Sequence, residues 1–195
     1  MEEGAADQST LMDGAVGPRS HAAAGLNRAS FTLMYRQEIG WVLNSLRRLG
    51  VASADLQDEA QRVFTAVWRQ RDSYDPQRPI RPWLFGFAYR TVRDHRRASW
   101  RRRAVLDEVE AVSDAPGADE AVEAARNRAL VLAALSEMDL DRRAVFVMID
   151  VDGATSPAAA DALGVPLGTV YSRLRLARAD FAAAVNRLRR RRGER

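Results

Sequence analysis

The stretch from Gly168 to Arg178 carries side chains that suit DNA recognition, and it reads Gly-Thr-Val-Tyr-Ser-Arg-Leu-Arg-Leu-Ala-Arg. Apolar residues recur in it at helical spacing, which predicts a helix with one buried stripe. The other sides of this helix present hydroxyl and guanidinium groups. An arginine there can donate two hydrogen bonds to a guanine edge in the major groove, and hydroxyls can hold phosphates. We expect the DNA contacts of this helix to come from Thr169, Tyr171, Ser172, Arg173, Arg175 and Arg178.

The residues before this stretch predict a helix-turn-helix. Ser156 and Pro157 are typical of an N-cap followed by proline at the first helical position, so a short helix is expected up to Leu163. Gly164 can adopt the positive φ that ends a helix, and a Val-Pro pair closes the turn. A short helix, a glycine turn and an arginine-bearing helix form the DNA-binding layout. An ordinary helical hairpin with a solvated arginine face is the alternative for this segment alone.

A third predicted helix, from Pro82 to about Ala98, is the second candidate site. Leu84, Phe87 and Ala88 are among its expected core residues. Its other sides interleave rings with arginines, as in proteins that bind single-stranded DNA, where stacking contributes ~1–3 kcal/mol per base. Some of these rings can instead complete the core, and we expect this of Phe85 or Tyr89. The residues on these sides are Trp83, Phe85, Tyr89, Arg90, Arg93, Arg96 and Arg97.

The composition excludes several kinds of site. The chain has no cysteine, and its two histidines, His21 and His95, are far apart, so we expect no disulfide, metal cluster or cofactor. No apolar run approaches the ~18–20 residues of a membrane span, and the N-terminus lacks the basic start of a signal peptide. We therefore expect a cytoplasmic protein that does not insert into membranes.

Charge is arranged in blocks along the chain, and all 30 basic residues are arginine. Residues 81–103 hold eight arginines and one aspartate, and residues 167–195 hold nine arginines and two acids. Between these blocks, residues 104–125 hold seven acids and no base. Two basic blocks suit two contacts with a polyanion, and the acidic block between them is expected to stay away from it.

The elements that position these sites are expected to be helices. A helical pattern from Phe31 to Leu49 ends at Gly50, and a second helix, capped by Ser53, extends to about Gln70. A proline-rich loop, 72–82, leads to the third helix. The prediction is an all-α protein of two small helical domains. Its parts are a disordered tail (1–29), a first domain (30–99), an acidic linker (100–125), a helix-turn-helix domain (126–188) and a basic tail (189–195).

Two groups of motifs resemble a known family. The first group is Asp55–Phe64 with Trp68, Tyr74-Asp75-Pro76, Pro82-Trp83-Leu84 and Asp94-His95-Arg96-Arg97. It is similar to region 2 of extracytoplasmic function (ECF) sigma factors. The second group, Gly164–Leu174 followed by Ala177-Arg178, is similar to their region 4. The resemblance covers residues 31–188, with Glu59 where the family usually has leucine and Arg62 where it usually has an acid.

The resemblance implies a protein that binds core RNA polymerase and directs it to promoter DNA. The second helix would dock on the clamp of the largest catalytic subunit through Asp55, Asp58, Gln61 and Phe64. The helix-turn-helix would read the −35 element as duplex. The acidic linker would extend toward the polymerase active-site cleft, and an anti-sigma factor is a possible partner. The −10 element would be recognised and melted through Tyr74, Asp75, Trp83, Tyr89, Arg90, Arg93, Arg96 and Arg97.

Two other functions are compatible with parts of the pattern. One is a helix-turn-helix regulator that acts independently of polymerase. The other is a metal-dependent nuclease or recombinase that uses Asp55, Asp58 and Asp75, because paired carboxylates can hold two Mg²⁺ ions. Asp55 and Asp58 lie near a helix start, however, where acids ordinarily stabilise the helix dipole. A promoter-specificity factor that is not an enzyme is therefore the leading hypothesis.

Overall fold

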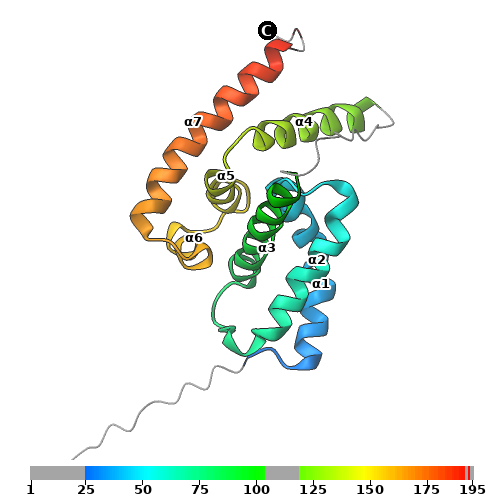
Figure 1. Cartoon of the computed structure of the whole chain (residues 1–195), viewed down its shortest axis with the longest axis vertical. Coiled ribbons are helices and arrows are strands. Elements are labelled where there is room, and N and C mark those ends of the chain that lie inside the picture. The colour runs from blue at the N-terminus through cyan, green and yellow to red at the C-terminus, as the bar shows by residue number, and fades with distance from the viewer. Residues whose placement is uncertain (1–24, 104–118, 192, 194–195) are drawn as a thin grey trace, which may run out of the picture.

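The computed structural model describes residues 25–103, 119–191 and 193 of the chain, and within them it contains helices and no strand. Three short turns lie between the helices: Ser53–Asp55, Arg71–Ser73 and the π-helical turn Val147–Val151. Figure 1 shows the arrangement. The helices are α1 (Arg28–Leu49), α2 (Leu56–Arg69), α3 (Ile80–Arg103), α4 (Asp119–Ser136), α5 (Leu140–Phe146), α6 (Ser156–Leu163) and α7 (Leu167–Arg191).

The N-terminal unit consists of α1, α2 and α3, which pack against one another in all three pairs. Asn27 caps α1 by accepting a hydrogen bond from the Ser30 amide at 2.9 Å, and Gly50 ends the helix with a φ of 95°. The predicted cap at Ser53 is not seen, because Ser53 begins the turn before α2 and makes no capping hydrogen bond there. The predicted three-helix core is otherwise present.

The middle of α3 is buried on every side. The six consecutive residues from Leu84 to Tyr89 are all buried. A helix that is apolar all round lies inside a larger structure, whereas a helix of a small isolated bundle keeps one face in water. Here α1 and α2 cover one side of α3, and α6 approaches the other. This arrangement joins the N-terminal unit to the rest of the chain.

The C-terminal unit consists of α4 to α7 and contains the predicted helix-turn-helix in α6 and α7. Thr155, not Ser156, caps α6, because its hydroxyl accepts from the Ala158 amide at 3.3 Å. Gly164 ends α6 with a φ of 66°, as predicted. The apolar stripe of α7 is buried at Val170, Leu174 and Ala177, against α5 and α6. The opposite face of α7 is therefore left to solvent.

Several helix and linker boundaries in the structure differ from those expected from composition. Helix α3 extends to Arg103 and α4 already begins at Asp119, so both enter the segment expected to be a linker. Helix α7 runs to Arg191 and includes most of the expected basic tail. Residues 25–29, expected within a disordered tail, include the start of α1, and the Leu26 amide donates to the Arg71 carbonyl at 3.1 Å. The expectations for residues 1–24, 104–118, 192 and 194–195 concern residues outside the described part of the chain.

The two units share one continuous apolar core, and a buried arginine connects them. Arg143 on α5 is 1% exposed and donates to the Leu49 carbonyl at the end of α1 at 2.8 Å. It also donates to the carbonyls of Ser136 and Met138, at 2.8 and 2.9 Å. Burial lowers the pKa of this guanidinium to about 10, so it stays charged at neutral pH. None of the described helices has the length and apolar character needed to span a membrane.

We expect Arg143→Ala to lower the free energy of unfolding by about 3 kcal/mol, because three carbonyl oxygens, two of them in buried hydrogen bonds, lose their donor and a cavity opens. Urea unfolding of the purified chain measures this change. Arg142→Ala is the matched control, since Arg142 forms only a half-exposed ion pair with Asp180. We expect the control to cost less than about 1 kcal/mol. Equal losses in the two variants would contradict the structural role of Arg143.

Candidate nucleic-acid interface

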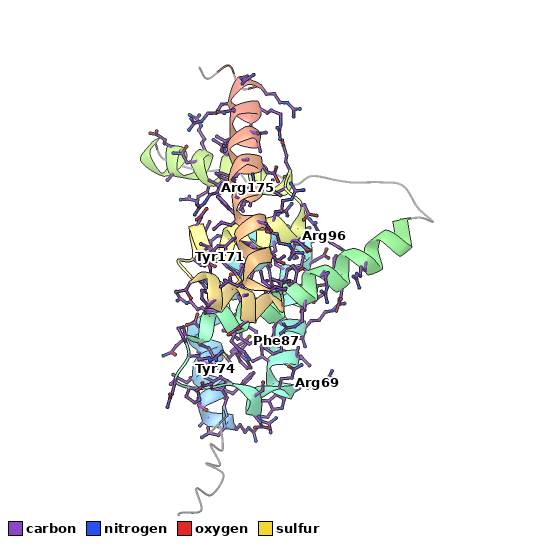
Figure 2. The ribbon with its side chains drawn as sticks, turned by 90° about the vertical axis from the view of Figure 1, so that its left-hand side faces the viewer. Arg69, Tyr74, Phe87, Arg96, Tyr171 and Arg175 are labelled. Carbon is purple, nitrogen blue, oxygen red and sulfur yellow. The ribbon has the colours of Figure 1, made fainter. Side chains whose placement is uncertain are left out.

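The outer face of α7 presents most of the residues predicted to read duplex DNA. Tyr171 is 55% exposed, and Arg175 is exposed and forms no ion pair with any residue that the structure describes. Figure 2 shows both side chains on this helix, above the N-terminal unit. Ser172 is also exposed, although its hydroxyl donates to the Thr169 carbonyl at 2.9 Å. Arg175 can therefore reach a base edge without first breaking an internal contact.

Two arginines of the predicted set are already engaged within the protein. Arg178 forms a bidentate pair with Asp150, at 2.8 Å from Nε and 2.7 Å from Nη2. The hydrogen bond from Arg178 lowers the pKa of the Asp150 carboxyl below its usual value. Arg173 forms an ion pair with Asp141 on α5. These two side chains must exchange an internal carboxylate for phosphate or base before they can contact DNA.

A cluster of rings lies where the 72–82 loop meets α3. The Trp83 ring is 5.0 Å from that of Tyr74 and 4.9 Å from that of Phe87, centroid to centroid. The Arg90 guanidinium lies over Phe87 at 4.6 Å. Trp83 is only partly buried, whereas Tyr74 is 8% exposed and donates from its hydroxyl to the Arg78 carbonyl. Of the three rings, Trp83 is therefore the one best placed to meet an unstacked base.

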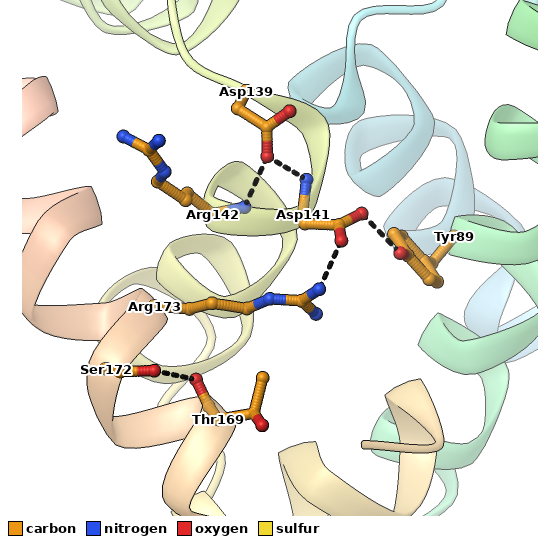
Figure 3. A network of polar contacts seen from close by, with 7 residues as sticks. All are labelled: Tyr89, Asp139, Asp141, Arg142, Thr169, Ser172 and Arg173. Atoms are coloured by element: carbon orange, nitrogen blue, oxygen red, sulfur yellow. Dashed lines mark hydrogen bonds and ion pairs between the residues drawn. The ribbon is translucent and has the colours of Figure 1, made fainter. Parts of the chain in front are cut away.

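Tyr89 and Phe85 do not lie on a free surface. Of the two interpretations of these rings, stacking on DNA bases or completing the core, the second is correct. Tyr89 is 4% exposed and Phe85 is 1% exposed. The Tyr89 hydroxyl donates to Asp141 of α5 at 2.6 Å, and the same carboxylate holds Arg173 (Figure 3). Burial, followed by this hydrogen bond, raises the pKa of Tyr89 to about 12. Asp141 of the C-terminal unit covers Tyr89, whereas the Phe85 ring lies 6.4 Å from that of Trp41 in α1. The sequence pattern of α3 alone does not reveal either neighbour.

The later turns of α3 carry the accessible arginines. Arg96 and Arg97 are exposed, and the Arg93 side chain is 41% exposed beside Asp94. Asp75, in the loop before α3, is exposed and accepts from the Gln77 amide at 2.9 Å. The predicted contacts of the first domain thus divide into an accessible basic end, a ring cluster that includes the buried Tyr74, and the buried Tyr89.

A groove of about 520 Å³ lies between α1 and α2, on a different part of the N-terminal unit. Asp58, Gln61 and Phe64 line it, as three of the four residues predicted to bind polymerase. Two edge-to-face ring pairs support it: Phe31 with Trp68 at 4.9 Å and Tyr35 with Phe64 at 4.7 Å between centroids. Asp55 precedes α2 and does not line the groove.

Glu59 points away from this groove, into the N-terminal unit. It is 2% exposed and accepts from His95 Nδ1 of α3 at 2.7 Å and from Arg62 at 3.0 Å. A buried carboxylate needs such partners because desolvation disfavours its charge. Glu59 therefore forms an internal contact between α2 and α3 and offers nothing to a partner at the surface, whereas Arg62 pairs with it from the exposed side of α2.

Comparison with known proteins identifies the family. Residues 34–102 match the profile "Sigma-70 region 2", and residues 128–181 match "Sigma-70, region 4". The chain is 31% identical over 176 residues to the RNA polymerase sigma factor CnrH of Cupriavidus metallidurans, covering 86% of this chain and 92% of that protein. The chain belongs to the ECF family of RNA polymerase sigma factors. It thus binds core RNA polymerase and directs it to promoters, as the sequence resemblance implied.

Other relatives of this sigma factor agree. The ECF sigma factor SigL of Mycobacterium tuberculosis is 28% identical over 160 residues, covering 82% of this chain and 90% of that one. The solved structure of CnrH in complex with the cytosolic domain of CnrY is similar with a TM-score of 0.60 and 27% identity, over 85% of this chain and 92% of that chain. The fold is also shared with RpoE of Bartonella quintana, solved with the anti-sigma factor NepR, at 24% identity and a TM-score of 0.55; the match covers 78% of this chain and 96% of that chain.

Several residues of this sigma factor that matter for the interface were not found by sequence reasoning. Asp141 joins Tyr89 to Arg173, Arg143 joins α5 to α1, and Gly86 lies where α6 approaches α3. Of the three, only Gly86 could have been singled out from the sequence, since a lone glycine inside a helical pattern often marks close approach of another backbone. The other two are ordinary helical residues in sequence, and their partners lie in the other unit.

We expect the tyrosinate absorbance of the folded chain to contain a component that titrates near pH 12, from Tyr89. An unfolded tyrosine titrates near pH ~10. Because the folded state holds this proton more tightly, the stabilisation is complete below pH ~10 and is lost as pH rises through about 12. Ultraviolet titration of the wild type minus that of Tyr89→Phe measures it. A difference curve centred near the unfolded value would show that Tyr89 is not held as described.

Proposed function

We propose that α7 of this sigma factor reads the −35 element as duplex DNA. The observation that carries this proposal is the two-sided character of α7. Val170, Leu174 and Ala177 are buried against the rest of the unit, while Tyr171 and Arg175 face solvent after a left-handed glycine turn. A helix held in this way can enter the major groove and place a guanidinium on guanine.

We propose further that α3 and the loop before it recognise and melt the −10 element. Trp83, supported by the rings of Tyr74 and Phe87, would stack on an unpaired base. The arginines at the far end of α3 would hold phosphates, which position DNA without reading its sequence. Asp75 is exposed close to the ring cluster and would contact the same strand.

The groove between α1 and α2 is our proposed site for the polymerase clamp. A coiled-coil helix can place its apolar side chains in a groove of this kind, where aromatic walls give contact area and Asp58 and Gln61 give polar contacts. None of the residues that line this groove belongs to the DNA-facing sets of α3 and α7. Polymerase and DNA can therefore be bound at the same time.

We propose that the protein has no catalytic chemistry of its own and acts in the cytoplasm, where polymerase and DNA are found. Among residues 25–103 and 119–191, no cluster of three histidine or acidic side chains could hold a metal ion, so the nuclease alternative gains no support. CnrH was solved in complex with the cytosolic domain of CnrY, and RpoE in complex with the anti-sigma factor NepR. By analogy, we propose that an anti-sigma factor controls this chain too.

Purified chain mixed with core RNA polymerase is expected to give specific initiation at its promoter, and Gln61→Arg is expected to weaken core binding about tenfold or more, corresponding to ~1.4 kcal/mol. The added guanidinium fills the groove without disturbing the core, because Gln61 is exposed. Pull-down of core polymerase and in vitro transcription measure these effects. Arg69→Gln is the control, since Arg69 is exposed on α2 outside the groove. Wild-type chain that fails to bind core polymerase would end this proposal.

Arg175→Ala is expected to lose roughly 1–3 kcal/mol of discrimination at one base pair of the −35 element if Arg175 reads guanine. Competition between promoter variants for the polymerase holoenzyme gives this number. Arg187→Ala is the control on the same helix. Arg187 forms an ion pair with Glu137 at 2.6 Å and lies several turns after the residues proposed to contact bases. A uniform loss of affinity across all variants would instead make Arg175 a phosphate contact.

A further inference from the structure

Large apolar side chains are exposed on the first turns of α7, the helix proposed to read the −35 element. Leu167, Tyr171 and Leu176 are 38%, 55% and 38% exposed, and they are three of the seven large apolar side chains exposed in the described part of the chain. Single exposed apolar residues are ordinary, whereas a group of them on one element marks a contact with another molecule. These turns therefore suit a partner that presents apolar groups of its own.

Two of these side chains flank the part of α7 that points away from the protein. The buried stripe that includes Val170 fixes this outward direction. At 3.6 residues per turn, the outward row passes through Ser172, Arg175 and Ala179, all of which are exposed. Tyr171 lies on one edge of this row and Leu176 on the other. A major groove that receives the helix would therefore meet both apolar side chains together with Arg175.

Few polar groups on these turns are free to read bases. Arg173 and Arg178 pair with carboxylates of the protein, and the Ser172 hydroxyl donates to the Thr169 carbonyl at 2.9 Å (Figure 3). Residues 167–179 contain no asparagine or glutamine, which pair with adenine, and no acid, which accepts from cytosine. The reading turns thus offer the guanidinium of Arg175 for guanine, and mainly apolar side chains for the bases beside it.

Thymine is the base that presents an apolar group, its C5-methyl, in the major groove. We propose that Tyr171 and Leu176 read thymine methyl groups next to the guanine that Arg175 contacts. This inference rests on the proposed −35 role of α7, and it adds the kind of base pair that the helix selects. Covering the methyl group removes apolar surface of both molecules from water, so each contact favours thymine over cytosine at its position.

Deoxyuridine tests this inference, because it differs from thymidine only by the absence of the C5-methyl group. The preferred −35 duplex is first selected from a random-sequence library, using the holoenzyme formed by the full-length chain and core polymerase. Each thymine of that duplex is then replaced singly by deoxyuridine, and competition for the holoenzyme measures the change in affinity. At the thymines that meet Tyr171 and Leu176, we expect a loss of about fourfold, which corresponds to the ~0.8 kcal/mol of one buried carbon group.

Variants of the two side chains assign each methyl contact. Leu176→Ala is expected to abolish the deoxyuridine effect at one thymine, and Tyr171→Ala at another. Leu33→Ala is the matched control, since it truncates an exposed leucine of α1 outside the proposed DNA-facing sets. Tyr171→Phe keeps the ring and is expected to keep the effect. Loss of the effect in Tyr171→Phe would show that the hydroxyl makes the contact and would overturn the assignment of Tyr171.

Two outcomes of the selection would overturn the inference as a whole. One is a preferred −35 duplex that contains no thymine, and the other is a duplex whose thymines all tolerate deoxyuridine without loss of affinity. The proposed −35 role of α7 is judged separately, by whether Arg175→Ala relaxes the selected sequence at a guanine. That result does not depend on any methyl group, so the two failures can be told apart.

Discussion

The position of α3, between two layers of helices, is the constraint on which the rest of the structure depends. Helices α1 and α2 pack on one side of it and α6 on the other, so the residues from Leu84 to Tyr89 are all buried. The same helix carries the ring cluster and arginines proposed to open promoter DNA. Any movement of the C-terminal unit therefore changes how much of α3 is available to nucleic acid.

The arginines of this sigma factor serve three physical purposes, although their sequence contexts are similar. Arg143 is buried and satisfies the carbonyls at helix ends. Arg173 and Arg178 pair with carboxylates of α5 and of the π-helical turn after it. Arg175 is exposed and available for a base or a phosphate. A count of positive charge over the chain cannot separate these purposes, since what distinguishes them is the distance to an acid or a carbonyl in a distant segment.

Much of the local structure was predictable because it depends on neighbouring residues. Gly50 and Gly164 end helices with positive φ, where a side chain would be strained, and the stripe of α7 follows from helical spacing. The boundaries of α3 and α4 were predicted less well. Composition marked an acidic segment as a linker, but alanine and glutamate favour helix, and α4 begins within that segment at Asp119.

The sequence by itself determined the all-α fold, the helix-turn-helix and the family, because these are encoded in spacing and in motifs of adjacent residues. Only the tertiary structure decided that Tyr89 is buried, that Glu59 faces His95, and that Asp141 joins the two units. The reason is physical: a helical period states which residues share a face, but it does not state what covers that face. In this protein a second helical unit covers that face, and it can pack closely because Gly86 has no side chain.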